Sequence, residues 1–183
     1  MCPLPDMWRF EVTIAVTSLT AVLVMMMAEL VRSRRNERAL RRRGAIEAKG
    51  DVYRTMAFAY PGMFVAMAVE GARFGPSTDA ILVGGFVLFV AAKLLKLWAI
   101  AALGSRWSYR VLVLPGIPLI TSGPYAHLRH PNYVAVFGEI AGFAMMVDAR
   151  LTGALSVILF AVLVRRRIAI EEHALKEALD AIK

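Results

Sequence analysis

The chain has 183 residues, 58% of them hydrophobic, and a formal net charge of +8. Its positive mean hydropathy of +0.58 argues against a soluble globular domain. The length fits a single domain over residues 1–183, with room for about four to six membrane helices. The lone cysteine, Cys2, excludes an intramolecular disulfide and a cysteine-based zinc site.

Five apolar stretches are long enough to be interpreted as membrane helices. They cover residues 8–31, 53–70, 79–103, 131–147 and 151–170. The first is too long and too uniform for a cleaved signal peptide. Only Asp148, Ala149 and Arg150 separate the last two, so these two should form an antiparallel hairpin. We therefore predict an all-α polytopic membrane helix bundle with about five transmembrane helices and a C-terminal helical hairpin.

The distribution of lysine and arginine predicts the orientation of this bundle. Nine of them follow the first stretch, three precede the fourth and five belong to the C-terminal segment, all on one side, against three on the other side. The positive-inside rule then places the N-terminus outside and the C-terminus in the cytoplasm. The basic cluster at 32–43 lacks interleaved aromatic residues, so anionic membrane lipids are favoured over nucleic acid as its partner.

The first of two polar segments on the cytoplasmic side covers residues 104–133. It ends in a dense group of polar residues after the turn signal Gly123-Pro124. His130 should cap the fourth helix and Pro131 should begin it. A helix N-terminus attracts a carboxylate or a phosphate, and Arg129 would strengthen that preference. The alternative is an interfacial loop whose tyrosines lie in an aromatic belt.

The second polar segment covers residues 165–175 and should continue the fifth helix. Arg167 and Glu171 stand four apart on one helical face, in the poorer order for an ion pair, so each is expected to have a separate partner. Glu172 lies on an adjacent face and can pair with Lys176. The alternative is a solvated, charged helix end.

Glu139 lies about two turns inside the fourth stretch. An ionisable residue within a membrane helix is a functional hypothesis by default, and its expected partner is Arg167 or a substrate hydroxyl. His127 and His130 lack a third ligand at helical spacing, so we expect no metal site. Four other charged residues are nearer to the ends of their stretches and are expected to extend toward the membrane surface: Glu29, Glu70, Lys93 and Lys96.

Two motifs make the C-terminal half similar to a known family. The segments GPYAHLRHPNYVAVFGE and RRRIAIEEHAL resemble the isoprenylcysteine carboxyl methyltransferase (ICMT) family, with its GPY turn, RHPxY element, tight helical hairpin and terminal RxxxEE. RHPxY alone also occurs in phospholipid N-methyltransferases and in NADPH-dependent membrane sterol reductases. Asn132 and Glu139 make the chain similar to a bacterial subgroup that resembles O-methyltransferases for alkylpyrones or alkylresorcinols.

This resemblance implies an integral membrane methyltransferase of a bacterial inner membrane, with its catalytic part at about 104–183. It would transfer a methyl group from S-adenosylmethionine to a lipophilic acceptor, at a carboxylate or at a phenol or enol oxygen. Arg167 would orient the acceptor, and Glu139 or His130 would act as base for a phenol or enol. By the same resemblance, seven residues are expected to bind S-adenosylmethionine: Tyr125, Arg129, His130, Pro131, Tyr133, Glu171 and Glu172.

Two alternatives belong to other functional classes. An NADPH-dependent membrane reductase could share the RHPxY element, although the terminal pair of glutamates favours the methyltransferase. A non-catalytic membrane adaptor or small transporter would not need Tyr125, His130 and Glu171 around one cavity. The methyltransferase hypothesis requires that clustering.

Overall fold

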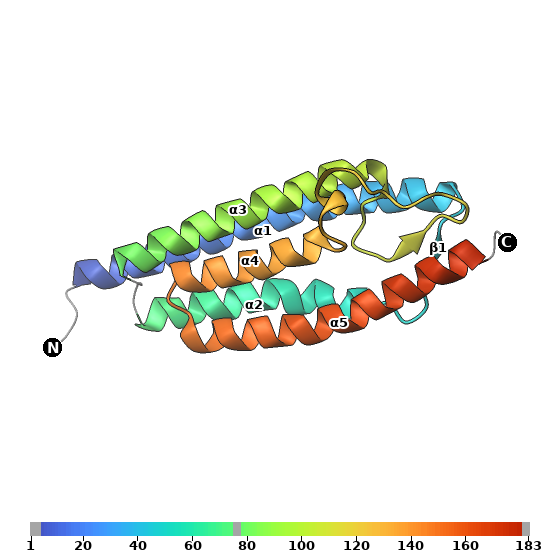
Figure 1. The fold of residues 1–183 in the computed structure, drawn as a ribbon. Helices are drawn as coiled ribbons and strands as arrows, with labels where there is room; N and C mark the ends of the chain where they lie inside the picture. The colour runs from blue at the N-terminus through green and yellow to red at the C-terminus, as the bar shows by residue number, and fades with distance from the viewer. Residues whose placement is uncertain (1–4, 75–77, 181–183) are drawn as a thin grey trace.

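The computed structural model describes residues 5–74 and 78–180, with side chains at 12–73 and 78–177, so Cys2 lies outside the described residues. The described residues form five α-helices that lie alongside one another (Figure 1). They are α1 (Pro5–Arg42), α2 (Tyr53–Phe74), α3 (Asp79–Leu103), α4 (Pro131–Met146) and α5 (Arg150–Asp180). The prediction of an all-α helix bundle is confirmed.

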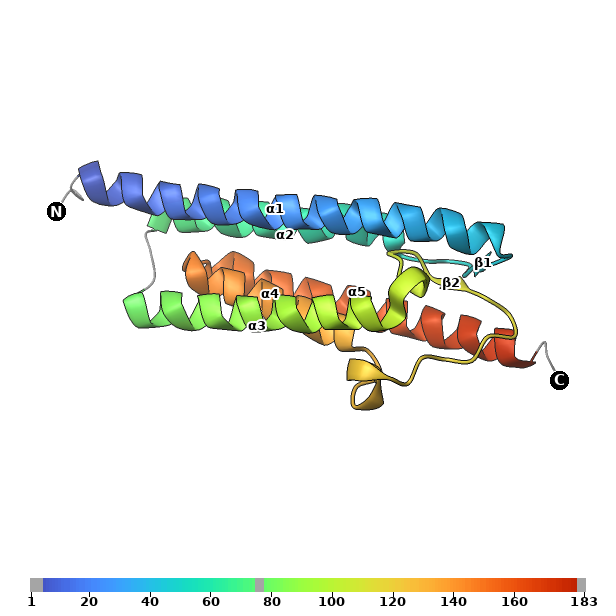
Figure 2. The ribbon, with the colours of Figure 1, turned by 90° about the horizontal axis from the view of Figure 1, so that it is seen from above.

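Helices α1 and α5 extend beyond the rest of the bundle at one end (Figures 1 and 2). The predicted stretches end at residues 31 and 170, whereas the helices continue to Arg42 and Asp180. Arginine dominates the first extension, and glutamate, alanine and leucine dominate the second. All are good helix formers, so nothing interrupts the backbone where the apolar stretches end. The two extensions flank the loops that form the site.

A short antiparallel ribbon lies between these two extensions. Strands β1 (Ile46–Glu47) and β2 (Leu112–Val113) pair with Ile46 opposite Val113. The long loop that contains β2 also holds two 3₁₀ turns, η1 (Gly104–Arg106) and η2 (Gly123–Ala126). Strands of two residues have no readable periodicity, so the sequence did not predict them. The ribbon joins the loop before α2 to the loop before α4.

Small residues bring α3 and α4 into close contact. A Cβ atom on Gly142 would lie 2.7 Å from the backbone nitrogen of Phe89, and one on Gly138 would lie 2.7 Å from the Cβ of Ala92. Glycines four apart allow membrane helices to approach closely. This approach places Glu139, between the two glycines in the sequence, against α3.

The hairpin between α4 and α5 is confirmed and is held by α2. The carboxylate of Glu70 accepts the backbone N–H groups of Leu151 at 2.9 Å and Thr152 at 2.6 Å. These are the first N–H groups of α5, which have no partner within the helix. Glu70 therefore caps α5, although its side chain was expected to extend toward the membrane surface.

The outer surface of the bundle is apolar. Val24, Val87, Leu94, Leu151 and Ile158 are each more than half exposed, as expected for side chains that contact lipid. Within the described residues, two helical stretches are long and apolar enough to cross a membrane, Val12–Arg42 and Asp79–Arg106. The protein core lies inside the bundle, around Phe64, Met67, Ile140 and Phe143.

Candidate active site

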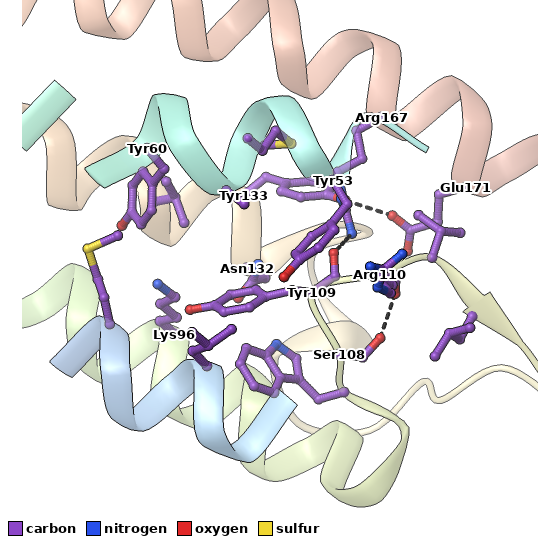
Figure 3. Close-up of a pocket in the computed structure, with 18 of the residues that line it drawn as sticks. Tyr53, Tyr60, Lys96, Ser108, Tyr109, Arg110, Asn132, Tyr133, Arg167 and Glu171 are labelled. Atoms are coloured by element: carbon purple, nitrogen blue, oxygen red, sulfur yellow. Dashed lines mark hydrogen bonds between the residues drawn. The ribbon is translucent and has the colours of Figure 1, made fainter. Parts of the chain in front are cut away.

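A cavity of about 800 Å³ is lined by residues of all five helices and of the loop between α3 and α4 (Figure 3). Tyrosine occurs five times in the chain. All five tyrosines line this cavity: Tyr53, Tyr60, Tyr109, Tyr125 and Tyr133. Trp107 lines it as well, so six aromatic rings of tyrosine and tryptophan lie on its wall.

The cavity has a polar part and an apolar part. Arg110, His130 and Glu171 line the polar part, near the ribbon and the extension of α5. The apolar part runs along α1, α2 and α5 and is lined by Leu23, Met26, Met27, Phe58 and Phe160. Met27 and Phe58 are 60% and 81% exposed, so this part reaches the outer surface between α1 and α2.

Tyr133 connects the two predicted polar segments. Pro131 begins α4 as expected, which puts Tyr133 in the first turn, facing α5. The Tyr133 hydroxyl donates to Glu171 Oε2 at 2.9 Å and accepts the N–H of Arg167 Nε at 2.9 Å. The ring of His130 stacks on Tyr133 with centroids 5.5 Å apart. Arg167 and Glu171 thus share Tyr133, whereas separate partners were expected.

Asp51 fixes the position of Arg167. Its Oδ1 lies 3.1 Å from Nη1 of Arg167, and both side chains are almost fully buried. Asp51 also accepts the backbone N–H groups of Tyr53 at 3.0 Å and Val111 at 2.9 Å, and Arg167 donates to the carbonyl of Tyr109. The expected pairing of Arg167 with Glu139 is therefore wrong, because the guanidinium lies in a network near the ribbon. No motif pointed to Asp51, which lies in a short loop far from both polar segments.

Four charged residues form a buried ring, the charged quartet Glu29, Lys93, Lys96 and Glu139. Lys93 Nζ lies 3.1 Å from Glu29 and 2.7 Å from Glu139, and Lys96 Nζ lies 2.7 Å from Glu29 and 3.3 Å from Glu139. Each side chain is at most 10% exposed. The expectation that Glu29, Lys93 and Lys96 extend toward the membrane surface is wrong. Because α1, α3 and α4 bring opposite charges together, each carboxylate is paired inside the bundle.

Two tyrosine hydroxyls connect the charged quartet to the cavity. Tyr60 donates to Glu139, and Tyr109 donates to Glu29 at 2.9 Å. Lys96 and both tyrosines line the cavity, while Glu29, Lys93 and Glu139 are not among its lining residues. The side chain of Tyr60 therefore separates Glu139 from the cavity. Sequence reasoning missed Tyr60, because a tyrosine in an apolar helix carries no motif.

The remaining predicted site residues divide into two groups. The cavity is lined by Tyr125, His130, Tyr133, Arg167 and Glu171. Outside it lie Arg129 and Glu172, which are exposed, and Pro131, which is buried at the start of α4. Glu172 lies 3.7 Å from His130 Nε2, so its described ionic contact is with this histidine and not with the expected Lys176.

Comparison with known proteins identifies the family. The model of the isoprenylcysteine carboxyl methyltransferase (ICMT) family matches residues 85–177. The chain is 30% identical to the uncharacterized protein YpbQ of Bacillus subtilis (strain 168) over 156 residues, 85% of this chain and 93% of the relative. It is 23% identical to an uncharacterized protein of Haemophilus influenzae over 155 residues, 84% of this chain and 90% of the relative. The chain belongs to the ICMT family.

Membership in the ICMT family makes the protein a membrane methyltransferase by class. The family match covers most of α3, all of α4, most of α5 and both polar segments. It does not cover α1 and α2, which bring Glu29 and Tyr60 to the site, nor the loop that brings Asp51. The matched motifs therefore form only part of the cavity wall.

The cavity suits the methyl donor expected for an ICMT-family protein. Its aromatic rings can contact an adenine ring and a sulfonium cation, and Glu171 can accept hydrogens from hydroxyl or ammonium groups. Asn132 lines the cavity, and its buried Oδ1 has no described hydrogen-bond partner. Burial and the negative charge of Glu171 raise the pKa of Tyr125, so its hydroxyl stays protonated at neutral pH.

Proposed function

We propose that the protein transfers a methyl group from S-adenosylmethionine to an oxygen of a lipophilic acceptor. One observation carries this proposal. A single cavity joins a polar, aromatic part beside the family motifs to an apolar part that reaches the lipid-exposed surface. Such a cavity can bind a polar methyl donor and a lipophilic acceptor at the same time.

The polar part is the proposed donor site. Tyr125, His130 and Tyr133 would hold the donor through their rings, and Glu171 would accept hydrogen bonds from its polar groups. Arg129 and Glu172 would act at its outer edge. The donor, when bound, supplies an electrophilic methyl group on sulfur. The contribution of the chain is to align the acceptor oxygen with that methyl and to exclude water, which can lower the barrier by about 7–11 kcal/mol.

The apolar part is the proposed acceptor site. Its lining of methionine, leucine and phenylalanine suits an alkyl tail entering from the bilayer between α1 and α2. Arg167 also lines the cavity, and the described hydrogen bonds use three of its five N–H groups. The remaining N–H groups could orient the acceptor oxygen. The similarity to the bacterial subgroup suggests an alkylpyrone or alkylresorcinol as acceptor.

The proposed location is a bacterial inner membrane with the active site at the cytoplasmic face. The basic extension of α1 lies at the same end of the bundle as the extension of α5 (Figure 1), and Arg167 of the basic run 165–167 lines the cavity. Lysine and arginine favour the cytoplasmic side. The donor would then enter from the cytoplasm and the acceptor from the lipid.

Calorimetry with S-adenosylhomocysteine on the purified protein tests donor binding. We expect binding by the wild type and a loss of about tenfold or more for Glu171→Gln, because a hydrogen bond to a charged group is removed. Glu177→Gln, an exposed change two turns further along α5, is the matched control and should bind like the wild type. Binding of NADPH without binding of S-adenosylhomocysteine would support the reductase alternative and contradict the proposal.

Lipid mass spectrometry tests the acceptor. Cells that produce the protein, grown with methyl-labelled methionine, should accumulate a lipophilic compound that carries the labelled methyl group on oxygen. Cells that produce Arg167→Ala should accumulate much less of it. Identical labelled lipids in cells with and without the protein would contradict the proposal.

A further inference from the structure

The wall of the cavity carries an excess of positive charge. Glu171 is the one acidic side chain among the described lining residues, and it accepts a hydrogen bond from Tyr133. Six lysine and arginine residues line the same cavity: Arg34, Arg54, Lys96, Arg106, Arg110 and Arg167. The attraction of this wall for an anion depends on which of the six charges are already compensated.

Three of the six cations are compensated by carboxylates. The pairs are Lys96 with Glu29 and Glu139, Arg110 with Glu37 and Glu47, and Arg167 with Asp51. Arg106 donates to the backbone carbonyl of Pro118 at 2.7 Å. The remaining two, Arg34 and Arg54, are exposed and make no ion pair or side-chain hydrogen bond within the described part of the chain. These two guanidinium groups can therefore bind a ligand without giving up another partner.

Arg34 and Arg54 lie at the depth of the lipid headgroups. Arg34 comes three residues after Val31, the end of the first apolar stretch, which is about 4.5 Å along a helix. Arg54 is the second residue of α2, where the second apolar stretch begins. The headgroup layer is about 5–8 Å thick on each side of the hydrocarbon. Both arginines are therefore placed in the layer that contains the lipid phosphates.

The apolar part of the cavity begins directly next to these arginines. On α1, Leu23, Met27 and Leu30 precede Arg34 at spacings of three or four residues, so they share one helical face with it. On α2, Phe58 lies one turn further into the membrane than the arginine. Met27 and Phe58 are exposed, so this opening faces the bilayer. It therefore combines an apolar groove with one free cation on each helix at its headgroup end.

We infer that an anionic phospholipid binds in the opening between α1 and α2. Its phosphate lies between Arg34 and Arg54, and one of its acyl chains lies in the apolar part of the cavity. Two guanidinium groups suit a phosphate, because each can donate two parallel hydrogen bonds to its oxygens. The bilayer supplies such a ligand directly to an opening that faces lipid. The site does not depend on methyl transfer, so its test is separate from that of the proposed function.

The two arginines belong to a different part of the chain from the proposed donor site. The residues assigned to the donor lie on η2, at the start of α4 and on α5, within the residues that the family model matches. Arg34 and Arg54 lie on α1 and α2, outside that match. The lipid site is therefore a feature of this chain and not of the part that it shares with the family model.

Native mass spectrometry of the purified 183-residue chain in detergent tests the site. The probes are palmitoyl-oleoyl phosphatidylglycerol and palmitoyl-oleoyl phosphatidylcholine, which share their acyl chains and differ in the net charge of the headgroup. We expect the wild type to bind phosphatidylglycerol about 25-fold more tightly, because each basic residue at the headgroup contributes about fivefold. Equal binding of the two lipids would overturn the inference.

The double variant Arg34→Gln/Arg54→Gln removes both proposed phosphate ligands, and Arg35→Gln/Arg38→Gln is the matched control. Arg35 and Arg38 are exposed on α1 and are not among the lining residues of the cavity, so the control removes the same amount of charge from the same basic cluster. The first variant should bind phosphatidylglycerol about 25-fold more weakly than the wild type, and the control within about threefold. Equal losses would indicate general electrostatic attraction and overturn the inference.

Two further measurements test the acyl chain and the other possible anions. Ala57→Trp places a large ring in the apolar part from an exposed position on α2, so it should weaken binding of both lipids. Glycerol 3-phosphate lacks an acyl chain, and S-adenosylhomocysteine belongs to the donor site, so neither should displace phosphatidylglycerol at millimolar concentration. Displacement by the first would identify a soluble phosphate ligand, and displacement by the second would assign the arginines to the donor. Either displacement, or unchanged lipid binding by Ala57→Trp, would overturn the inference.

Discussion

Asp51 shows how one buried carboxylate can organise a site. It holds the guanidinium of Arg167, the first turn of α2 and the backbone of the loop at Val111. Removal of one partner from a buried ion pair leaves an uncompensated charge, which is more costly than loss of the attraction itself. Asp51 should therefore matter for stability as well as for activity.

We predict that Asp51→Ala destabilises the protein by about 3–5 kcal/mol and abolishes most methyl transfer. The control is Arg150→Ala, because Arg150 pairs with Asp148 while its own side chain is 83% exposed. A surface pair of this kind contributes at most about 1 kcal/mol. Thermal unfolding in detergent measures both variants. Similar midpoints for the two variants would refute the assigned role of Asp51.

The sequence predicted the role of a residue only where that residue belongs to a recognisable motif. Tyr125, His130, Tyr133, Arg167 and Glu171 were expected around one cavity, and the structure brings them together. The charged quartet was not expected, because its members lie in three separate apolar stretches: Glu29 in the first, Lys93 and Lys96 in the third, and Glu139 in the fourth. Their pairing depends on the relative rotation of three helices, which a hydropathy pattern does not specify.

At the scale of elements, the contact between α3 and α4 depends on glycines. We predict that Gly142→Ala destabilises the bundle by about 1–3 kcal/mol, because its Cβ would meet backbone atoms of α3 at 2.7–2.8 Å. Gly62→Ala is the control, since no atom lies within 4 Å of the Cβ position and alanine favours a helix by up to about 1 kcal/mol. Thermal midpoints should fall for Gly142→Ala alone, and a comparable fall for Gly62→Ala would contradict this packing argument.

The ribbon should loosen in acid. Burial alone would raise the pKa of Glu47, but hydrogen bonds from Arg41 and Arg110 outweigh it and hold the pKa below its ordinary value of 4.5. The stabilisation from Glu47 is thus fully present above pH 4.5 and is lost as the pH falls through the lowered folded-state pKa.

Hydrogen exchange at matched pH values measures this effect. Protection of the amides near β1 and β2, corrected for intrinsic exchange, should decrease in acid in the wild type. In Glu47→Gln, protection of these amides should be weaker than in the wild type at neutral pH and should change less with pH. Equal pH dependence in both proteins would show that another group controls the ribbon.

Element starts were easier to predict than element ends. α2, α3 and α4 begin at the predicted residues 53, 79 and 131, and the preference of proline for the first helical position accounts for the start of α4. The ends of α1 and α5 were missed, because hydropathy marks the membrane boundary and not the last helical hydrogen bond. The ribbon is a tertiary contact between two loops and has no local signal.

At the scale of the whole molecule, the site is formed where helix ends converge with two loops, so it exists only in one orientation relative to the membrane. If the positive-inside rule holds, the polar part of the cavity faces the cytoplasm, where S-adenosylmethionine is made. A reversed orientation would expose the proposed donor site to a compartment that lacks S-adenosylmethionine. Topology and function are therefore linked in this protein.

Cysteine labelling tests the orientation. In a Cys2→Ser background, Lys176→Cys on the extension of α5 and Arg150→Cys at the hairpin turn mark opposite ends of the bundle. A membrane-impermeant maleimide added to intact bacterial spheroplasts should label Arg150→Cys, and label Lys176→Cys only after lysis. The basic extension of α1 and the arginines at 165–167 give the reason, because positively charged segments are retained in the cytoplasm. Labelling of Lys176→Cys before lysis would place the cavity's polar part outside the cell, away from the methyl donor, and would contradict both the orientation and the proposed donor.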